Sequence, residues 1–181
     1  KMNALPQDYC READAKIFSA VLALPEYQSA KTIFCFVGMK AEIQTAALIE
    51  EMLRAGKRVA VPRCAGKGMM HAHRLQSLEE LSPGTMGILE PRETAELVPP
   101  EALDLILLPC VSASRAGERL GYGGGFYDRY LPKTKAFRAL LIREQMLSDD
   151  IPREAHDQPV DAVVTESGIF HRAQSENEGV S

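Results

Sequence analysis

The stretch Asp104-Leu105-Ile106-Leu107-Leu108-Pro109 decides the fold of this chain. Its four central residues are all apolar, without any alternation between polar and apolar positions. A strand of this kind is buried on both faces, as in the middle of a parallel sheet that is covered by helices. Residues 104–109 are therefore predicted to form a central strand.

Candidate strands and helices alternate on both sides of this stretch. Apolar residues recur at helical spacing over residues 9–24 and 42–54. The other candidate strands are residues 31–37, 58–61, 69–75, 139–142 and 162–165, and residues 77–81 form a helical turn. Such alternation indicates a mostly parallel, Rossmann-like sheet with helices on both faces. We predict an α/β fold: a single three-layer α/β/α domain at 1–172 and a polar, frayed tail at 173–181.

The chain continues from the central strand into Arg119-Leu120-Gly121-Tyr122-Gly123-Gly124-Gly125-Phe126-Tyr127-Asp128-Arg129. Four glycines among five residues leave backbone N–H groups uncovered, which suits the wrapping of a phosphate chain. A helix beginning after Gly125 would add its N-terminus to the anion site. Arg119 and Arg129 offer cationic donors to oxyanions, and Asp128 could hold a metal ion among them. The stretch therefore predicts a triphosphate site.

Two other glycine patterns are excluded. A dinucleotide fingerprint that starts at Gly121 needs a glycine at position 126, which is Phe126. A Walker loop ends in Gly-Lys followed by Ser or Thr, and this chain contains no such run.

The glycine stretch resembles the conserved motif of the 5-formyltetrahydrofolate cyclo-ligase family, also called methenyltetrahydrofolate synthetases. The similarity runs from about residue 5 to about residue 169. Further stretches resemble the family in the expected order: residues 24–27, 42–45, 56–63, 87–91 and 151–157. The family usually begins with a basic Lys-x-x-x-Arg helix that binds ATP phosphates, whereas only Lys1 precedes Arg11 here. Either further residues precede Lys1, or this member has lost part of its ATP site.

The resemblance implies an enzyme that uses ATP and Mg²⁺ to convert 5-formyltetrahydrofolate into 5,10-methenyltetrahydrofolate, ADP and phosphate. The expected catalytic residues are Arg119, Tyr127 and Asp128. ATP is expected to bind to Arg119, Leu120, Gly121, Tyr122, Gly123, Gly124, Gly125, Phe126 and Tyr127. The expected folate-binding residues are Val37, Glu42, Tyr122 and Phe126. Mg²⁺ is expected at Asp128 and, on the resemblance alone, at Asp157.

Some of these roles have a physical basis in the residues themselves. Glu42 follows a strand, and its carboxylate can accept two adjacent N–H donors of a reduced pterin ring; the alternative is an acid in the first turn of a helix. Tyr122, Phe126 and Tyr127 could stack on folate or adenine, although the latter two are equally suited to core packing. Val37 would pack either in the core or against a flat ring.

Composition limits the partners. The chain has 181 residues, a net charge of −4 and 45% hydrophobic residues, which is ordinary for a globular protein. This charge argues against binding to nucleic acid or to anionic membranes. The resemblance implies small-molecule substrates, reduced folate and ATP, and we expect a monomer or a weak homodimer. Four cysteines without Cys-x-x-Cys spacing, and no long apolar run, favour a cytoplasmic protein with reduced thiols.

Two alternatives remain open from the sequence. One is a non-catalytic homologue that binds folate or nucleotide. The other is a sugar-phosphate isomerase or CoA-transferase-like enzyme of similar layout, which would turn over without consuming ATP.

Overall fold

The structure is a computed structural model that describes residues 5–38, 42–84, 87–109, 112–113, 119–120, 125–148 and 158–171. Its α-helices are α1 (Gln7–Ala23), α2 (Pro25–Ser29), α3 (Ala46–Arg54) and α4 (Phe126–Tyr130). Short 3-10 helices are η2 (Leu78–Glu80), η4 (Pro100–Ala102), η5 (Leu131–Lys133) and η6 (Glu144–Met146).

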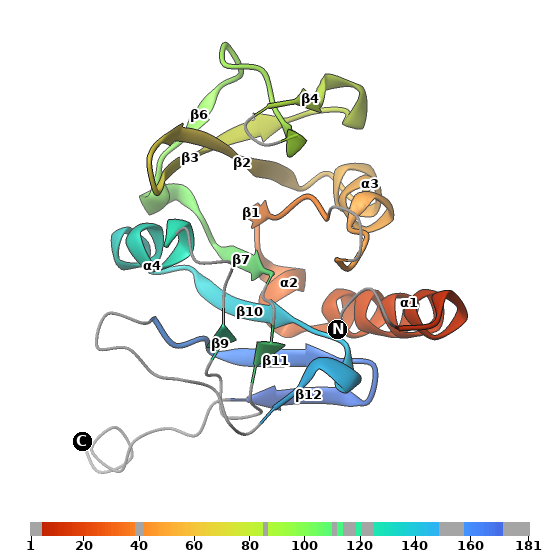
Figure 1. The fold of residues 1–181 in the computed structure, drawn as a ribbon. Helices are drawn as coiled ribbons and strands as arrows, with labels where there is room; N and C mark the ends of the chain where they lie inside the picture. Colours follow the sequence, from red (N-terminus) through yellow and green to blue (C-terminus); the bar gives the residue numbers. More distant parts are fainter. Residues whose placement is uncertain are drawn as a thin grey trace, which may run out of the picture.

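One large sheet organises the fold (Figure 1). Its eight strands lie in the order β12-β11-β10-β7-β1-β2-β3-β6. The strands are β1 (Thr32–Cys35), β2 (Arg58–Gly66), β3 (Met69–Leu75), β6 (Leu97–Val98), β7 (Leu105–Leu108), β10 (Phe137–Leu141), β11 (Ala162–Thr165) and β12 (Gly168–His171). Two small ribbons pair β4 (Ser82–Pro83) with β5 (Leu89–Glu90), and β8 (Ser112–Ala113) with β9 (Arg119–Leu120).

The centre of the sheet is parallel and its edges are antiparallel. β11, β10, β7, β1 and β2 pair in parallel, whereas β12, β3 and β6 join in antiparallel pairs. β7 lies in the middle with all four residues buried, as the apolar run at residues 104–109 predicts. The prediction of a mostly parallel α/β sheet is therefore confirmed.

Helices cover both faces of this sheet. Because strand side chains alternate between faces, Ile33 and Cys35 belong to one core cluster and Phe34 to the other. The first cluster contains buried residues of α1, α2 and α3, and the second contains Tyr130 of α4 and Leu131 of η5. Figure 1 shows α1 and α3 on one side of the stacked strands and α4 on the other. The predicted three layers are present, with a thin third layer.

Several element bounds differ from the prediction. α1 ends at Ala23 because Leu24 adopts an extended conformation before Pro25, which opens α2. The strand predicted to end at Val61 continues as β2 to Gly66. Pairing of β2 with β1 ends at Ala60, and beyond it β2 pairs only with β3. Pro62 lies in this second part, where a residue without an N–H group can be accommodated.

Two further expectations concern thiols and membranes. Cys35 is buried, and burial raises the pKa of its thiol, while Cys10 and Cys64 are half-buried and not in disulfides. Within the described residues, none of the helices combines the length and the apolar character that crossing a membrane requires. The cytoplasmic location remains an expectation.

Candidate active site

A pocket lies where three central strands end. It is lined by Phe36, which follows β1, by Pro109, which follows β7, and by Leu141, Ile142, Arg143 and Met146 at the end of β10 and in η6. Glu42 and Ile43 complete the lining. Ligands of parallel α/β sheets bind at this edge, beyond the carboxyl ends of the strands, so the pocket lies where this fold is expected to bind its ligand.

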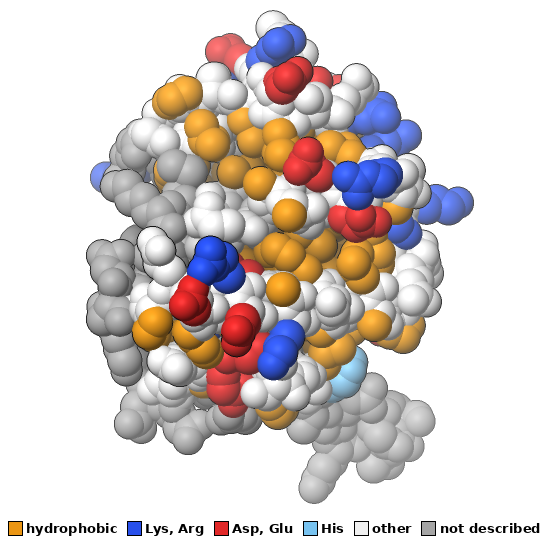
Figure 2. Space-filling view, turned by 90° about the vertical axis from the view of Figure 1, so that its right-hand side faces the viewer, with side chains coloured by type: hydrophobic (Ala, Val, Ile, Leu, Met, Phe, Trp, Pro, Cys, Tyr) orange, Lys and Arg blue, Asp and Glu red, His pale blue; other side chains and the backbone are white. Residues whose placement is uncertain are grey.

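The lining combines apolar walls with a few charged groups. An arrangement of this kind suits a flat ring that carries polar edges. Charged side chains also surround an area of hydrophobic side chains on the side of the molecule that carries α1 and α3 (Figure 2).

Glu42 lies in the loop before α3. The sequence placed it in the first turn of a helix, but α3 begins only at Ala46, so that prediction is wrong. Thr45 explains why the helix begins later than predicted, since its hydroxyl donates to Phe36 O at 2.7 Å and accepts from Gly38 N at 3.0 Å. These bonds draw the chain into a loop and keep residues 42–45 out of the helix.

Gly38 closes the same loop from the other side. A Cβ at this position would lie 1.8 Å from Ile43 O, so only glycine allows the two backbones to approach. Val37, an expected folate-binding residue, is half-buried and packs against the first core cluster. It is not among the pocket-lining residues; its neighbour Phe36 is.

An ion pair that was not predicted from the sequence lies beside the pocket. Arg143 Nε donates to Asp14 Oδ1 at 2.9 Å, and Arg143 Nη2 donates to Asp14 Oδ2 at 3.1 Å. Arg143 is 5% exposed and Asp14 is 9% exposed. Burial acts to lower the pKa of the Arg143 guanidinium, but the hydrogen bonds and the charge of Asp14 outweigh it and raise the pKa. The sequence does contain an indication of the role of Asp14, because this acidic residue lies with Ala13 and Ile17 on the apolar face of its helix, where an acid is buried only with a partner.

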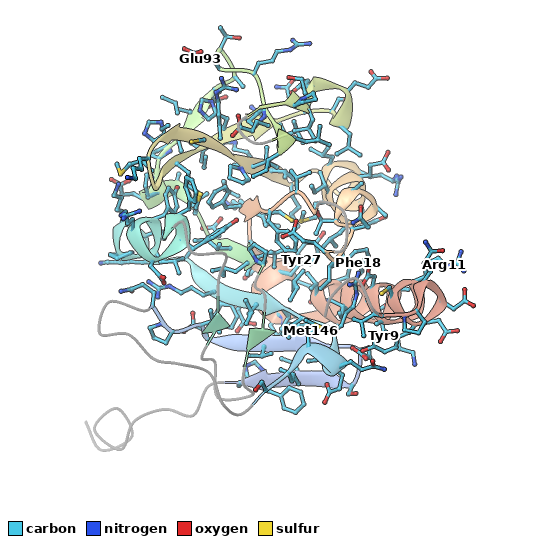
Figure 3. All side chains as sticks on the ribbon, viewed as in Figure 1. Tyr9, Arg11, Phe18, Tyr27, Glu93 and Met146 are labelled. Carbon is cyan, nitrogen blue, oxygen red and sulfur yellow. The ribbon has the colours of Figure 1, made fainter. Side chains whose placement is uncertain are left out.

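A second network anchors η6 beside this pair. The Tyr9 hydroxyl donates to Glu166 Oε2 at 2.5 Å and accepts from Gln145 N at 3.1 Å, and Glu144 N donates to Glu166 Oε1 at 2.8 Å. Burial and the bond to Glu166 raise the pKa of Tyr9 to about 12. Figure 3 shows Tyr9 on α1 at the same end of the molecule as Met146. The start of α1 is thereby tied to the pocket wall.

The glycine-rich stretch is described at its two ends. Arg119 and Leu120 form β9, and Gly125 precedes α4 with φ of 71°. The expected helix after the glycines is therefore confirmed, and the left-handed conformation of Gly125 is one that favours glycine. Gly121, Tyr122, Gly123 and Gly124 lie outside the described residues, as does the side chain of Arg119. α4 has five residues, so its macrodipole is small.

The two aromatic residues that open α4 pack inward. Phe126 and Tyr127 are half-buried against the second core cluster, and the Tyr127 ring lies 6.5 Å from that of Phe34. Neither residue lines the pocket that contains Glu42. Core packing, one of the two roles open to them, therefore accounts for much of their surface. Arg129 Nη1 donates to Gly68 O at 3.2 Å.

Asp128 faces the segment that precedes β11. Its Oδ1 accepts a hydrogen bond from Gln158 N at 3.2 Å, and Gln158 directly follows Asp157 in the sequence. Asp157 itself lies outside the described residues. Within the described part of the chain, no group of three or more His, Cys, Asp and Glu side chains could hold a metal. Magnesium sites beside phosphates commonly use only one or two carboxylates, so Asp128 fits such a site.

Comparison with known proteins identifies the family. A family model described as "5-formyltetrahydrofolate cyclo-ligase family" matches residues 1–166. The 5-formyltetrahydrofolate cyclo-ligase of Escherichia coli K12 is 31% identical over 178 residues, which cover 94% of this chain and 97% of the relative. A probable 5-formyltetrahydrofolate cyclo-ligase of Schizosaccharomyces pombe is 30% identical over 85% of this chain and 84% of the relative.

Solved structures agree with these relatives. The 5,10-methenyltetrahydrofolate synthetase of Aquifex aeolicus superposes with a TM-score of 0.83 at 31% identity, covering 96% of this chain and 88% of that protein. The synthetase of Mycoplasma pneumoniae has a TM-score of 0.73 at 20% identity over 91% and 92% of the two chains, a likeness that concerns the fold alone. The resemblance and the enzyme class inferred from the sequence are confirmed. This chain belongs to the 5-formyltetrahydrofolate cyclo-ligase family.

Proposed function

We propose a residue-level mechanism for the reaction of this family, the conversion of 5-formyltetrahydrofolate into 5,10-methenyltetrahydrofolate. The conversion itself follows from the family and from its relatives, and ATP is the co-substrate of this ligase class. The observation that carries the mechanism is the pocket at the carboxyl edge of the sheet, with Glu42 in its wall.

The difficulty of the reaction lies in the leaving group. The formyl oxygen on N5 would have to depart as oxide or hydroxide, which are poor leaving groups. Transfer of the ATP γ-phosphoryl group to this oxygen converts it into phosphate and releases ADP. N10 of the same folate then attacks the formyl carbon, N10 loses its proton, the ring closes and phosphate departs. The enzyme's part is to position the groups in line and to neutralise charge.

ATP phosphates are proposed to bind along the glycine stretch, from Arg119 through Gly121–Gly125 to Phe126 and Tyr127. Pro109 supports this arrangement, because it lines the pocket and the chain leads from it toward β8, β9 and the glycines. The mechanism requires a triphosphate held there to lie next to a folate in the pocket. Arg119 is proposed to neutralise the phosphoryl group during transfer, and the Tyr127 hydroxyl to orient it.

Asp128 and Asp157 are proposed as carboxylate ligands of Mg²⁺. Asp128 is half-buried beside the backbone of Gln158, and an uncompensated carboxylate there would repel a phosphate. A bound Mg²⁺ would neutralise phosphate oxygens that these carboxylates alone would repel. The two aspartates then serve as ligands and need not act as bases.

Glu42 is proposed to recognise the pterin ring in the pocket, with Val37 packing behind the wall. Tyr122 and Phe126 are proposed to contact the folate outside this pocket. The Glu42 carboxylate can accept two adjacent N–H donors of the ring, and the apolar wall formed by Phe36, Ile142 and Met146 suits the ring face.

Turnover of the purified protein tests the mechanism. With 5-formyltetrahydrofolate, ATP and Mg²⁺ we expect the methenyl chromophore to appear together with equal amounts of ADP and phosphate. Product formation without ATP consumption would overturn the phosphoryl-transfer mechanism. Binding of folate and ATP without any product would instead identify a non-catalytic homologue.

A further inference from the structure

Arg143 and Asp14 form a buried joint between distant parts of the chain. Asp14 lies on α1, and Arg143 follows β10 at the start of η6, 129 residues away along the sequence. Both nitrogen–oxygen contacts of the pair are within 3.1 Å. Arg143 is among the residues that line the pocket, while Asp14 is not.

Both members of the pair also bind the loop that carries Glu42. Arg143 Nη2 donates to Glu42 O at 3.2 Å, and Gln44 N donates to Asp14 Oδ2 at 3.4 Å. The Gln44 side chain adds a bond from Nε2 to Glu42 O at 2.9 Å. The pair therefore holds the backbone on both sides of Ile43, which itself lines the pocket.

The loop needs such support for a physical reason. Residues 42–44 belong to neither a strand nor α3, so their backbone lies outside the hydrogen-bond patterns of these elements, whereas Thr45 O accepts a helix bond from Ile49 N at 2.8 Å. Thr45 secures only the far end of the loop, next to Phe36 and Gly38. Binding of a ligand costs less conformational entropy when the protein groups that contact it are already held in place.

Stability alone does not account for the pair. Buried ion pairs can often be replaced by apolar side chains of similar volume without loss of stability, because desolvation offsets the attraction. The bidentate contact does fix a direction, since the planar guanidinium and the carboxylate meet in one geometry.

We propose that Asp14 and Arg143 are positioning residues, which hold the backbone of residues 42–44 so that Glu42 is presented to the pterin ring. This inference rests on the proposed role of Glu42 in folate recognition. Arg143 acts through the loop, and its effect on folate binding passes through Glu42.

Conservative substitutions test this role. Arg143→Lys keeps a positive charge beside Asp14 but loses the planar guanidinium, which bonds both Asp14 and Glu42 O. Asp14→Asn keeps the shape of the side chain but loses its charge. We expect each variant to weaken folate binding by about tenfold with ATP binding unchanged, while the melting temperature falls because a buried charge loses some or all of its pairing. Folate and ATP titrations and KM values measure these effects.

Combination with Glu42→Gln distinguishes positioning from direct contact. In the Glu42→Gln background, Arg143→Lys should cause almost no additional loss of folate affinity, because the residue through which it acts has already been disabled. Full additivity would overturn the proposal and indicate that Arg143 touches the substrate itself. If a single variant does not fold, the uncharged pair Asp14→Leu with Arg143→Met leaves no unpaired buried charge and takes its place.

Lys57 provides a matched control. Its Nζ donates to the carbonyls of Tyr27, Gln28 and Ala30 at the end of α2, so it is a hydrogen-bonded cation that does not line the pocket. Lys57→Met should lower the melting temperature and leave folate affinity unchanged. Unchanged folate affinity in Arg143→Lys and Asp14→Asn, or equal losses for folate and ATP, would contradict the proposal.

The wild-type protein separates this inference from the proposed mechanism. Folate binding without turnover would refute the mechanism, while the binding titrations would still test the positioning role. A wild-type protein that does not bind 5-formyltetrahydrofolate would overturn both.

Discussion

Two acidic side chains, Asp128 and Glu42, have different surroundings, and these surroundings indicate their roles. The Asp128 carboxylate meets a backbone N–H of Gln158, next in sequence to Asp157. Glu42 lines a pocket whose other walls are mostly apolar. A carboxylate beside phosphate calls for a cation, whereas one in an apolar pocket calls for N–H donors.

Asp128→Asn should raise the Mg²⁺ concentration needed for half-maximal turnover by about tenfold or more, because a neutral amide is a weaker ligand for a hard cation. Folate binding in the absence of nucleotide should stay the same. Asp104→Asn is the control, since Asp104 Oδ2 accepts bonds from Lys31 N and Thr32 N and serves only the backbone. A metal requirement that does not change, together with a loss of folate affinity, would refute the ligand role.

Glu42→Gln should cost roughly 2–4 kcal/mol of folate affinity, because it replaces a charge-assisted acceptor by an NH₂ group that faces a donor on the ring. ATP affinity of the free enzyme should be nearly unchanged. Glu51→Gln on neighbouring α3 removes only an exposed ion pair with Arg54 and should change neither affinity. Titrations with each ligand measure the effects, and undiminished folate binding would return Glu42 to a structural role.

At the scale of elements, the turn into α4 depends on a glycine in the left-handed conformation. Gly125 has φ of 71°, and a Cβ added to it would lie 3.0 Å from Arg129 Nη1. Arg129 Nη1 also donates to Gly68 O, so the start of α4 is linked to the hairpin between β2 and β3. A side chain at position 125 would therefore add crowding to backbone strain.

Gly125→Ala should lower stability by roughly 1–2 kcal/mol through the left-handed backbone alone. It should also weaken ATP binding by on the order of tenfold, since the residue before α4 must move away from Arg129. Gly56→Ala is a close control, because Gly56 has φ of 84° with nothing within 4 Å of the added Cβ. That variant should lose similar stability and keep its ATP affinity. Equal ATP affinities in both variants would argue against a phosphate site at this turn.

Local sequence patterns predicted the helices and strands better than the loops and long-range contacts that connect them. The spacing of apolar residues located α1, α3 and the parallel strands because each depends on neighbours in sequence. The start of α3 was misplaced because the Thr45 hydroxyl bonds a carbonyl nine residues earlier. The pairing of Asp14 with Arg143 spans 129 residues, and only the folded sheet brings the two together.

Across the whole molecule, the sheet separates two buried clusters, and the second contains an unusual tyrosine. Tyr130 is 3% exposed, its ring lies 5.2 Å from that of Phe34, and its hydroxyl has no hydrogen-bond partner among the described residues. Burial, and to a lesser extent the charge of Glu101, raises its pKa from 10.0 to about 12. Well below pH 10 the Tyr130 side chain is protonated in both the folded and the unfolded state. It therefore contributes no pH dependence to the free energy of unfolding in that range.

Between pH 10 and pH 12 the unfolded chain loses the Tyr130 proton first, so the free energy of unfolding should fall, by up to roughly 3 kcal/mol. Tyr130→Phe should remove this part of the alkaline loss and be neutral or slightly stabilising at pH 7, because it deletes an unpaired buried hydroxyl. Tyr9→Phe is the contrast: its hydroxyl is bonded to Glu166 and Gln145 N, so that variant should already be destabilised at pH 7. Urea unfolding at pH 7, 9.5 and 11.5 measures both. A clear loss of stability in Tyr130→Phe at pH 7 would show that the hydroxyl is satisfied in solution.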